Sequence, residues 1–138
     1  MQAEKFSSYL LERFGIVLPA DVELVGENSL RVMNKGLKGF ATSTPKGIPA
    51  SRMKGKFPKP TTAFVQVFGK LANKNVISVG EEDAMRYLAG EEFETGAGDV
   101  ETGYVIVQHE GAVLGIGFYK EGRVENMLPK GRRIRKKN

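Results

Sequence analysis

The sequence predicts an α+β protein, in which an N-terminal α+β lobe precedes a small β-barrel with a covering helix. Three features of the 138 residues support this fold class. Helical spacing of apolar residues is confined to short segments, Pro and Gly crowd the middle of the chain, and the last third alternates short apolar runs with Glu-Gly turns. A chain of this length can bury a core without disulfides or metals.

The N-terminal lobe is predicted for residues 1–73. Four apolar residues share one face of a helix expected over residues 3–14: Phe6, Tyr9, Leu10 and Phe14. Gly15 can end this helix in the left-handed conformation. Alternating apolar residues on both sides of Gly26 then predict a β-hairpin from residues 22–25 and 30–33.

Residues 39–60 are predicted to form a long basic surface loop with at most one short strand, because few regular elements tolerate so many prolines and glycines. Either Thr61 or Thr62 can cap a short helix that runs to about Leu71. The Asn-Lys-Asn sequence at 73–75 breaks the pattern, and the lobe boundary is expected there.

The barrel is predicted for residues 74–133, with a basic tail at 134–138. A strand at 76–79 precedes a helix whose first turn is acidic and which ends at Gly90. The rest is a meander of short strands at 104–107, 112–118 and 123–125, joined at Glu110-Gly111 and Glu121-Gly122. We expect Gly115 and Gly117 to permit close approach inside the barrel.

Acidic and basic residues are segregated along the chain. Residues 28–80 contain ten Lys or Arg and no acid, whereas residues 81–101 contain eight acids against Arg86 alone. Residues 130–138 then carry six basic groups and no acid. With a net charge of +5, this segregation predicts a positively charged face and a polyanionic partner.

The sequence contains none of the familiar motifs for catalysis, for a cofactor or for a metal site. The absence of Cys excludes thiolate chemistry, and a single histidine, His109, cannot build a multi-histidine zinc site. Neither a phosphate-binding glycine loop nor an HExxH motif occurs. We therefore expect no enzyme activity and no cofactor. A cytoplasmic location is expected, because no run approaches the roughly 20 apolar residues that span a bilayer and the polar start lacks a signal-peptide pattern.

The run from Gly103 to Arg135 resembles the C-terminal part of PUA domains attached to Sun-type RNA cytosine methyltransferases. The resemblance is carried by Gly103-Tyr104-Val105, Leu114-Gly115-Ile116-Gly117, Tyr119-Lys120 and the run from Asn126 to Arg133. Residues 59–70 and 74–76 resemble the segment that joins such a domain to its preceding lobe, and the first 60 residues resemble that lobe. The methyltransferase core and its catalytic cysteines are missing. The resemblance therefore implies a PUA-like barrel that binds tRNA or rRNA without catalysis, in RNA modification or ribosome biogenesis.

The candidate RNA-binding residues combine charge with this resemblance. They are Arg52, Lys54, Lys56, Lys59, Lys70, Lys74, Arg86, Tyr119, Lys120, Lys130, Arg132, Arg133 and Arg135. The segment from Arg52 to Lys59 is either a binding loop or an edge strand protected by lysines. The PUA resemblance also directs RNA toward Arg86 and the loop after Gly90, but that loop is acidic.

This acidic loop leaves an alternative open. Either another face binds RNA, or residues 81–101 dock a basic partner such as a ribosomal protein or a separate RNA methyltransferase. A small enzyme that uses carboxylates and Lys on RNA is a third reading. Two explanations without an RNA-binding role also remain open: the basic tail is simply solvated, and Tyr119 simply packs against its neighbours.

Overall fold

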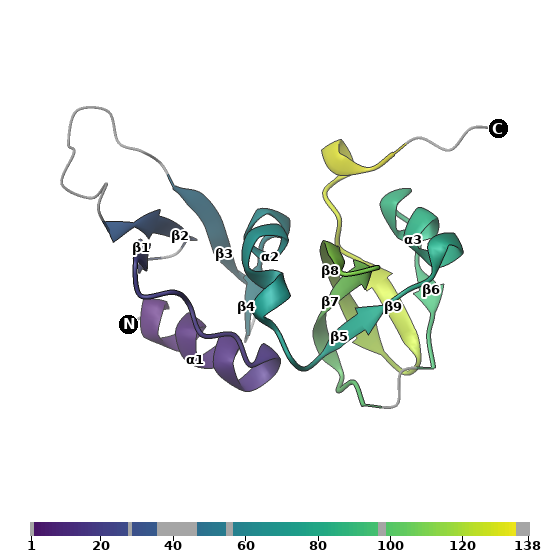
Figure 1. Cartoon of the computed structure of the whole chain (residues 1–138), viewed down its shortest axis with the longest axis horizontal. Coiled ribbons are helices and arrows are strands. Elements are labelled where there is room, and N and C mark those ends of the chain that lie inside the picture. Colours follow the sequence, from purple (N-terminus) through teal and green to yellow (C-terminus); the bar gives the residue numbers. More distant parts are fainter. Residues whose placement is uncertain (1, 28, 36–46, 55–56, 97–98, 135–138) are drawn as a thin grey trace.

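The fold is taken from a computed structural model, which describes residues 2–27, 29–35, 47–54, 57–96 and 99–134. Two β-sheets lie side by side, and helix α2 lies between them (Figure 1). Helix α2 contacts β3 of the first sheet and β8 of the second. This arrangement confirms the predicted α+β class.

The helices are α1 (Gln2–Phe14), α2 (Thr62–Phe68) and α3 (Glu81–Leu88), and the short 3-10 helices are η2 (Gly69–Leu71) and η3 (Lys130–Arg132). The first sheet contains β1 (Val22–Val25), β2 (Ser29–Asn34), β3 (Ile48–Lys54) and β4 (Phe57–Pro60). The second contains β5 (Val76–Ser78), β6 (Phe93–Glu94), β7 (Gly103–His109), β8 (Ala112–Lys120) and β9 (Arg123–Asn126).

The first sheet has the strand order β1-β2-β3-β4 and is antiparallel throughout. The prediction of one long loop over residues 39–60 is wrong for residues 48–54 and 57–60, which form the paired strands β3 and β4; residues 39–46, 55 and 56 lie outside the described residues. The prolines are compatible with these strands for two reasons. Pro58 and Pro60 lie in the edge strand β4, and Pro49 lies where the β2–β3 register shifts.

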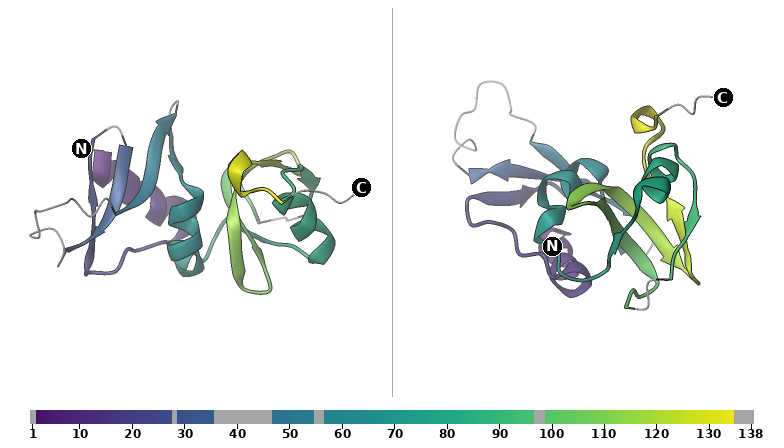
Figure 2. Two further views of the ribbon diagram at one scale, coloured as in Figure 1. Left: turned by 90° about the horizontal axis from the view of Figure 1, so that it is seen from above. Right: turned by 45° about the vertical axis from the view of Figure 1, so that its right-hand side comes forward.

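The second sheet has the order β5-β7-β8-β9-β6 and curls into a half-barrel (Figure 2). Strand β5 runs parallel to β7, and the other neighbours are antiparallel. Both predicted Glu-Gly turns are confirmed, with φ of 48° and 80° at Glu110-Gly111. Gly115 and Gly117 also behave as predicted, since a Cβ on Gly115 would lie 2.3 Å from the Tyr87 hydroxyl oxygen.

One hydrophobic core extends across both sheets. It joins α1 and α2 to the barrel strands β7 and β8, with Phe6 and Phe64 packed edge to face at 5.5 Å. Ile106 and Ile116, both fully buried, are the barrel residues of this cluster. A second core lies inside the barrel around Tyr87. Because the first core includes residues from both sheets, their relative placement is fixed by packing.

Polar contacts reinforce this junction. Arg13 at the end of α1 donates hydrogen bonds to the carbonyls of Glu101 and Tyr104, both at 2.7 Å. The buried Asn75 donates to the Arg13 carbonyl at 2.6 Å and accepts from the Glu101 amide at 3.1 Å. Asn75 has a φ of 56°, a conformation that Asn tolerates better than most residues.

Candidate nucleic-acid interface

A groove of about 400 Å³ lies between the two sheets, and we call it the inter-sheet groove. Its lining residues come from the β3–β4 hairpin, the start of α2 and the segment after β9: Pro49, Arg52, Lys59, Pro60, Thr61, Thr62, Ala63, Met127, Pro129 and Arg132. The chain therefore brings together residues more than 70 positions apart in the printed sequence. Three of the predicted RNA-binding residues, Arg52, Lys59 and Arg132, meet here.

Two of these cations are fixed by the register of the hairpin. Arg52 on β3 is directly opposite Lys59 on β4. Cross-strand partners project from the same face of a sheet, so both side chains line the groove. Thr61 then caps α2: its hydroxyl accepts from the Phe64 amide at 3.0 Å and donates to the Pro49 carbonyl. This cap holds the hairpin against the start of the helix.

Gln66 positions the third cation, Arg132. The guanidinium of Arg132 donates to Gln66 Oε1 at 2.7 Å, and Gln66 Nε2 donates to the Leu114 carbonyl of β8 at 3.0 Å. Gln66 therefore connects the C-terminal 3-10 helix to α2 and to the barrel. Lys130 lies on the same 3-10 helix and is exposed.

Arg133 anchors the end of the described chain to helix α3. Its Nε donates to the Leu128 carbonyl at 3.0 Å, and the Ile134 amide donates to the Leu88 carbonyl at 2.8 Å. The Arg133 side chain passes over Gly90, which has a φ of 89°. A Cβ on Gly90 would lie 2.4 Å from Arg133 Cδ. The prediction that Gly90 ends the helix is confirmed, and the absence of a side chain also makes room for Arg133.

The side of the molecule formed by α3, β6 and β9, which we call the acidic side, has a different chemistry. Arg86 is bound by Asp83 at 2.8 Å and by Glu82 at 2.7 Å, and the hydrogen bond with Asp83 is the main cause of its raised pKa. Arg123 likewise lies 3.1 Å from Glu92 and 3.7 Å from Glu94.

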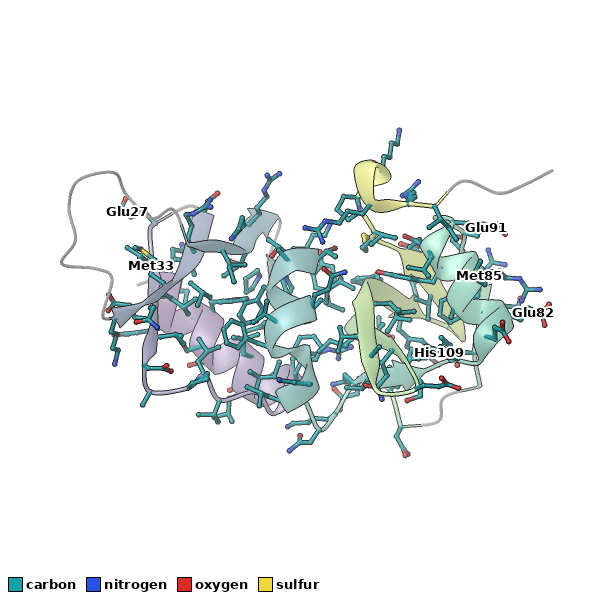
Figure 3. All side chains as sticks on the ribbon, turned by 45° about the horizontal axis from the view of Figure 1, so that its top comes forward. Glu27, Met33, Glu82, Met85, Glu91 and His109 are labelled. Atoms are coloured by element: carbon teal, nitrogen blue, oxygen red, sulfur yellow. The ribbon has the colours of Figure 1, made fainter. Side chains whose placement is uncertain are left out.

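Figure 3 shows Glu82, Met85 and Glu91 at the opposite end of the molecule from Glu27, which lies between β1 and β2, and from Met33 of β2. The predicted RNA contact of Arg86 therefore lies among carboxylates and outside the inter-sheet groove.

The remaining candidates are dispersed. Lys70 and Lys74 are exposed beyond the far end of α2, and Lys120 is exposed at the β8–β9 turn. Tyr119 is half-buried against the barrel core, in agreement with the packing alternative. The side chains of Lys54, Lys56 and Arg135 lie outside the described residues. The predicted face is thus assembled only in part.

Sequence reasoning missed the apolar walls of the groove and the role of Gln66. Pro49 is far in the sequence from Met127 and Pro129, and only the fold brings it to them. The 3-10 helix that carries Arg132 also gave no periodic signal, because it is only three residues long. The Thr61 cap, in contrast, is a local signal that the sequence did give for this region.

The curled five-stranded sheet and its covering helix α3 form a half-barrel, and the basic inter-sheet groove adjoins it. Residues 74–134 match the family described as the methyltransferase RsmF PUA domain. This segment is therefore a PUA domain that resembles the PUA region of Sun-type methyltransferases, as the sequence predicted, and RNA is the partner that such a domain indicates. The match covers the PUA domain and no methyltransferase catalytic domain. No curated protein matches the sequence.

Two further findings concern the described residues alone. They hold no group of three or more His, Asp or Glu side chains arranged to bind a metal ion. Within the same ranges, none of the helices combines the length and the apolar character needed to cross a bilayer.

Proposed function

We propose that this protein is a non-catalytic, cytoplasmic RNA-binding protein that holds structured tRNA or rRNA at the inter-sheet groove. The observation that carries the proposal is the meeting of Arg52, Lys59 and Arg132 beside a PUA domain. Arg and Lys neutralise phosphates and release condensed counterions, which gives affinity without reading sequence. In this role the protein presents RNA to a separate modifying or ribosome-assembly enzyme.

The proposal is supported by the electrostatic environment of these cations. Among the described residues, neither Arg52 nor Arg132 forms an ion pair with a carboxylate, and Arg132 is held by a neutral amide. A phosphate that enters the groove therefore does not have to displace a carboxylate from either arginine. The exposed Lys130 extends the same positive region along the 3-10 helix.

A salt titration tests this function. We expect wild-type protein to bind tRNA and rRNA fragments with an affinity that falls steeply with salt. The variant Arg52→Gln/Lys59→Gln/Arg132→Gln should lower the slope of log K against log salt by about two to three. Its matched control, Arg86→Gln/Lys120→Gln/Arg123→Gln, removes the same charge from the acidic side and the β8–β9 turn. Equal loss by both variants, or salt-insensitive binding by the wild type, would reject the groove as the RNA site.

One observation favours a second function, protein docking through the acidic side. Met85 on α3 is 52% exposed, although it is a large apolar residue, and it follows Glu81, Glu82 and Asp83 on the same helix. An apolar side chain within an acidic region suits a partner that is basic and partly apolar. A pull-down of ribosomal proteins and RNA methyltransferases with wild type and Met85→Ser/Glu81→Lys tests this role; undiminished capture by the variant would exclude it.

A further inference from the structure

The walls of the inter-sheet groove are mostly apolar, which phosphate binding alone does not require. Pro49, Pro60 and Pro129 line it together with Met127 and Ala63, while the cations are Arg52, Lys59 and Arg132. A surface that recognises only phosphates needs exposed cations and no apolar cavity. Apolar walls favour a group that is itself poorly hydrated on its faces. A nucleobase is such a group, since each base has an apolar π-face.

The size of the groove limits what can enter. Its volume of about 400 Å³ lies within the range of small-ligand sites, roughly 300–1,000 Å³. In a double helix the bases are stacked and paired, so none of their faces is available to a cavity. An unpaired base from a loop or a bulge, in contrast, can be turned outward into a cavity of this size.

We propose that the inter-sheet groove receives one unpaired RNA base between its proline and methionine walls, while Arg52, Lys59 and Arg132 hold the adjoining phosphates. This inference rests on the proposed RNA-binding function and adds the chemical group that is recognised. The site is composite, because Pro49 comes from the first sheet and Met127 from the segment that follows the barrel strands.

The groove should distinguish unpaired from paired nucleotides more strongly than it distinguishes one base from another. The hydroxyl of Thr61 is already used, since it caps α2 and donates to the Pro49 carbonyl. Base identity is read by hydrogen bonds to base edges, whereas apolar contact with the faces tolerates any base. The walls of proline and methionine therefore select the pairing state.

Three RNA stems of the same sequence test this inference: one fully paired, one with a single-nucleotide bulge, and one with an abasic ribose at the bulge. We expect the bulged stem to bind about tenfold more tightly than the paired stem, and the abasic stem to lose that gain. The abasic stem keeps the phosphate and the flexibility of the bulge, so it isolates the base. The fluorescence of a 2-aminopurine at the bulge should increase on binding. The base would leave the stack of its neighbours, and none of the described residues that line the groove is aromatic and able to stack on it in turn.

The matched variant is Pro49→Ala/Met127→Ala, which removes apolar wall and keeps every cation. It should reduce binding of the bulged stem to the level of the paired stem without changing the salt slope. Thermal unfolding identifies any loss of fold, and Pro49→Ala alone, at an exposed strand position, serves if the double variant is unstable.

The outcomes separate this inference from the function on which it rests. Equal, salt-dependent affinity for all three stems would overturn base recognition and leave phosphate binding by the groove intact. Absence of salt-dependent binding to any stem would overturn both.

Discussion

The inter-sheet groove and the acidic side both present arginines, but their arginines are surrounded by different partners. Arg86 and Arg123 are each bound by two carboxylates of their own region. Arg132 is held by the amide of Gln66, and Arg52 faces Lys59 across the hairpin. An arginine already paired with carboxylates attracts a phosphate less strongly, because the neighbouring negative charges repel the phosphate and offset the positive charge. The local partners of each arginine therefore predict the RNA site better than the net charge does.

The largest effect is expected from charge reversal in the groove. Arg132→Glu places a carboxylate beside the phosphate path, so RNA affinity at about 0.1 M salt should fall roughly 100-fold, as measured by filter binding. The same reversal on the acidic side, Arg123→Glu, should change RNA affinity less than about twofold. It should instead lower thermal stability, because Glu92 and Glu94 would then face a third carboxylate. If both reversals weaken RNA binding equally, the distinction between the two regions is wrong.

A smaller effect is expected where the C-terminal segment is anchored to α3. Gly90→Ala forces a non-glycine residue into a φ of 89° and places its Cβ against Arg133 Cδ. We expect a loss of about 2 kcal/mol in the free energy of unfolding, together with weaker RNA binding as the segment that carries Arg132 loosens.

The control for this anchor is Gly131→Ala in the 3-10 helix, where a Cβ would meet no atom within 4 Å. It should leave denaturant unfolding and RNA binding unchanged. Equal destabilisation by both substitutions would show that Gly90 has no special packing role.

The regular parts of this fold could be predicted because their signals are local. The apolar face of α1, the Thr61 cap and the two Glu-Gly turns each depend on residues that lie close together in the sequence. The β3–β4 hairpin was missed for a physical reason. Proline disfavours strands in general, and only the edge position of β4 and the register shift opposite Pro49 remove that conflict.

The candidate site was predictable in its chemistry and less so in its geometry. Charge segregation identified Arg52, Lys59 and Arg132, but nothing in the sequence indicated that these three meet while Lys70 lies beyond the other end of α2. The pairing of Arg86 with Glu82 and Asp83 has the i+3 and i+4 spacing of a helix, so that part was open to prediction. Contacts between distant segments, such as Gln66 with Arg132, required the fold.

A third, smaller effect is expected from the residue that orients Arg132. Gln66→Ala removes both the contact with Arg132 and the one with the Leu114 carbonyl, so RNA affinity should fall about three- to fivefold. The charge on Arg132 remains, so the salt slope should stay near the wild-type value, whereas Arg132→Gln should lower it by about one.

A double-mutant cycle distinguishes positioning from an independent contact. If Gln66 acts through Arg132, Gln66→Ala should have little further effect on the affinity of an Arg132→Gln protein. Additive losses would mean that Gln66 contacts RNA itself or supports the groove by another route.

The smallest effect is expected from neutralising the acidic side. Glu92→Gln/Glu94→Gln releases Arg123 from its two carboxylates and removes two negative charges from the region. At about 0.15 M salt the Debye length is near 8 Å, so groups remote from the groove are largely screened and affinity should change less than about twofold. At about 0.01 M salt the screening length grows to roughly 30 Å, and a modest gain in affinity should emerge. A large gain already at about 0.15 M salt would mean that RNA lies against Arg123 itself. The acidic side would then be a second RNA-binding surface that its own carboxylates weaken, and it would differ from the groove only in its balance of charges.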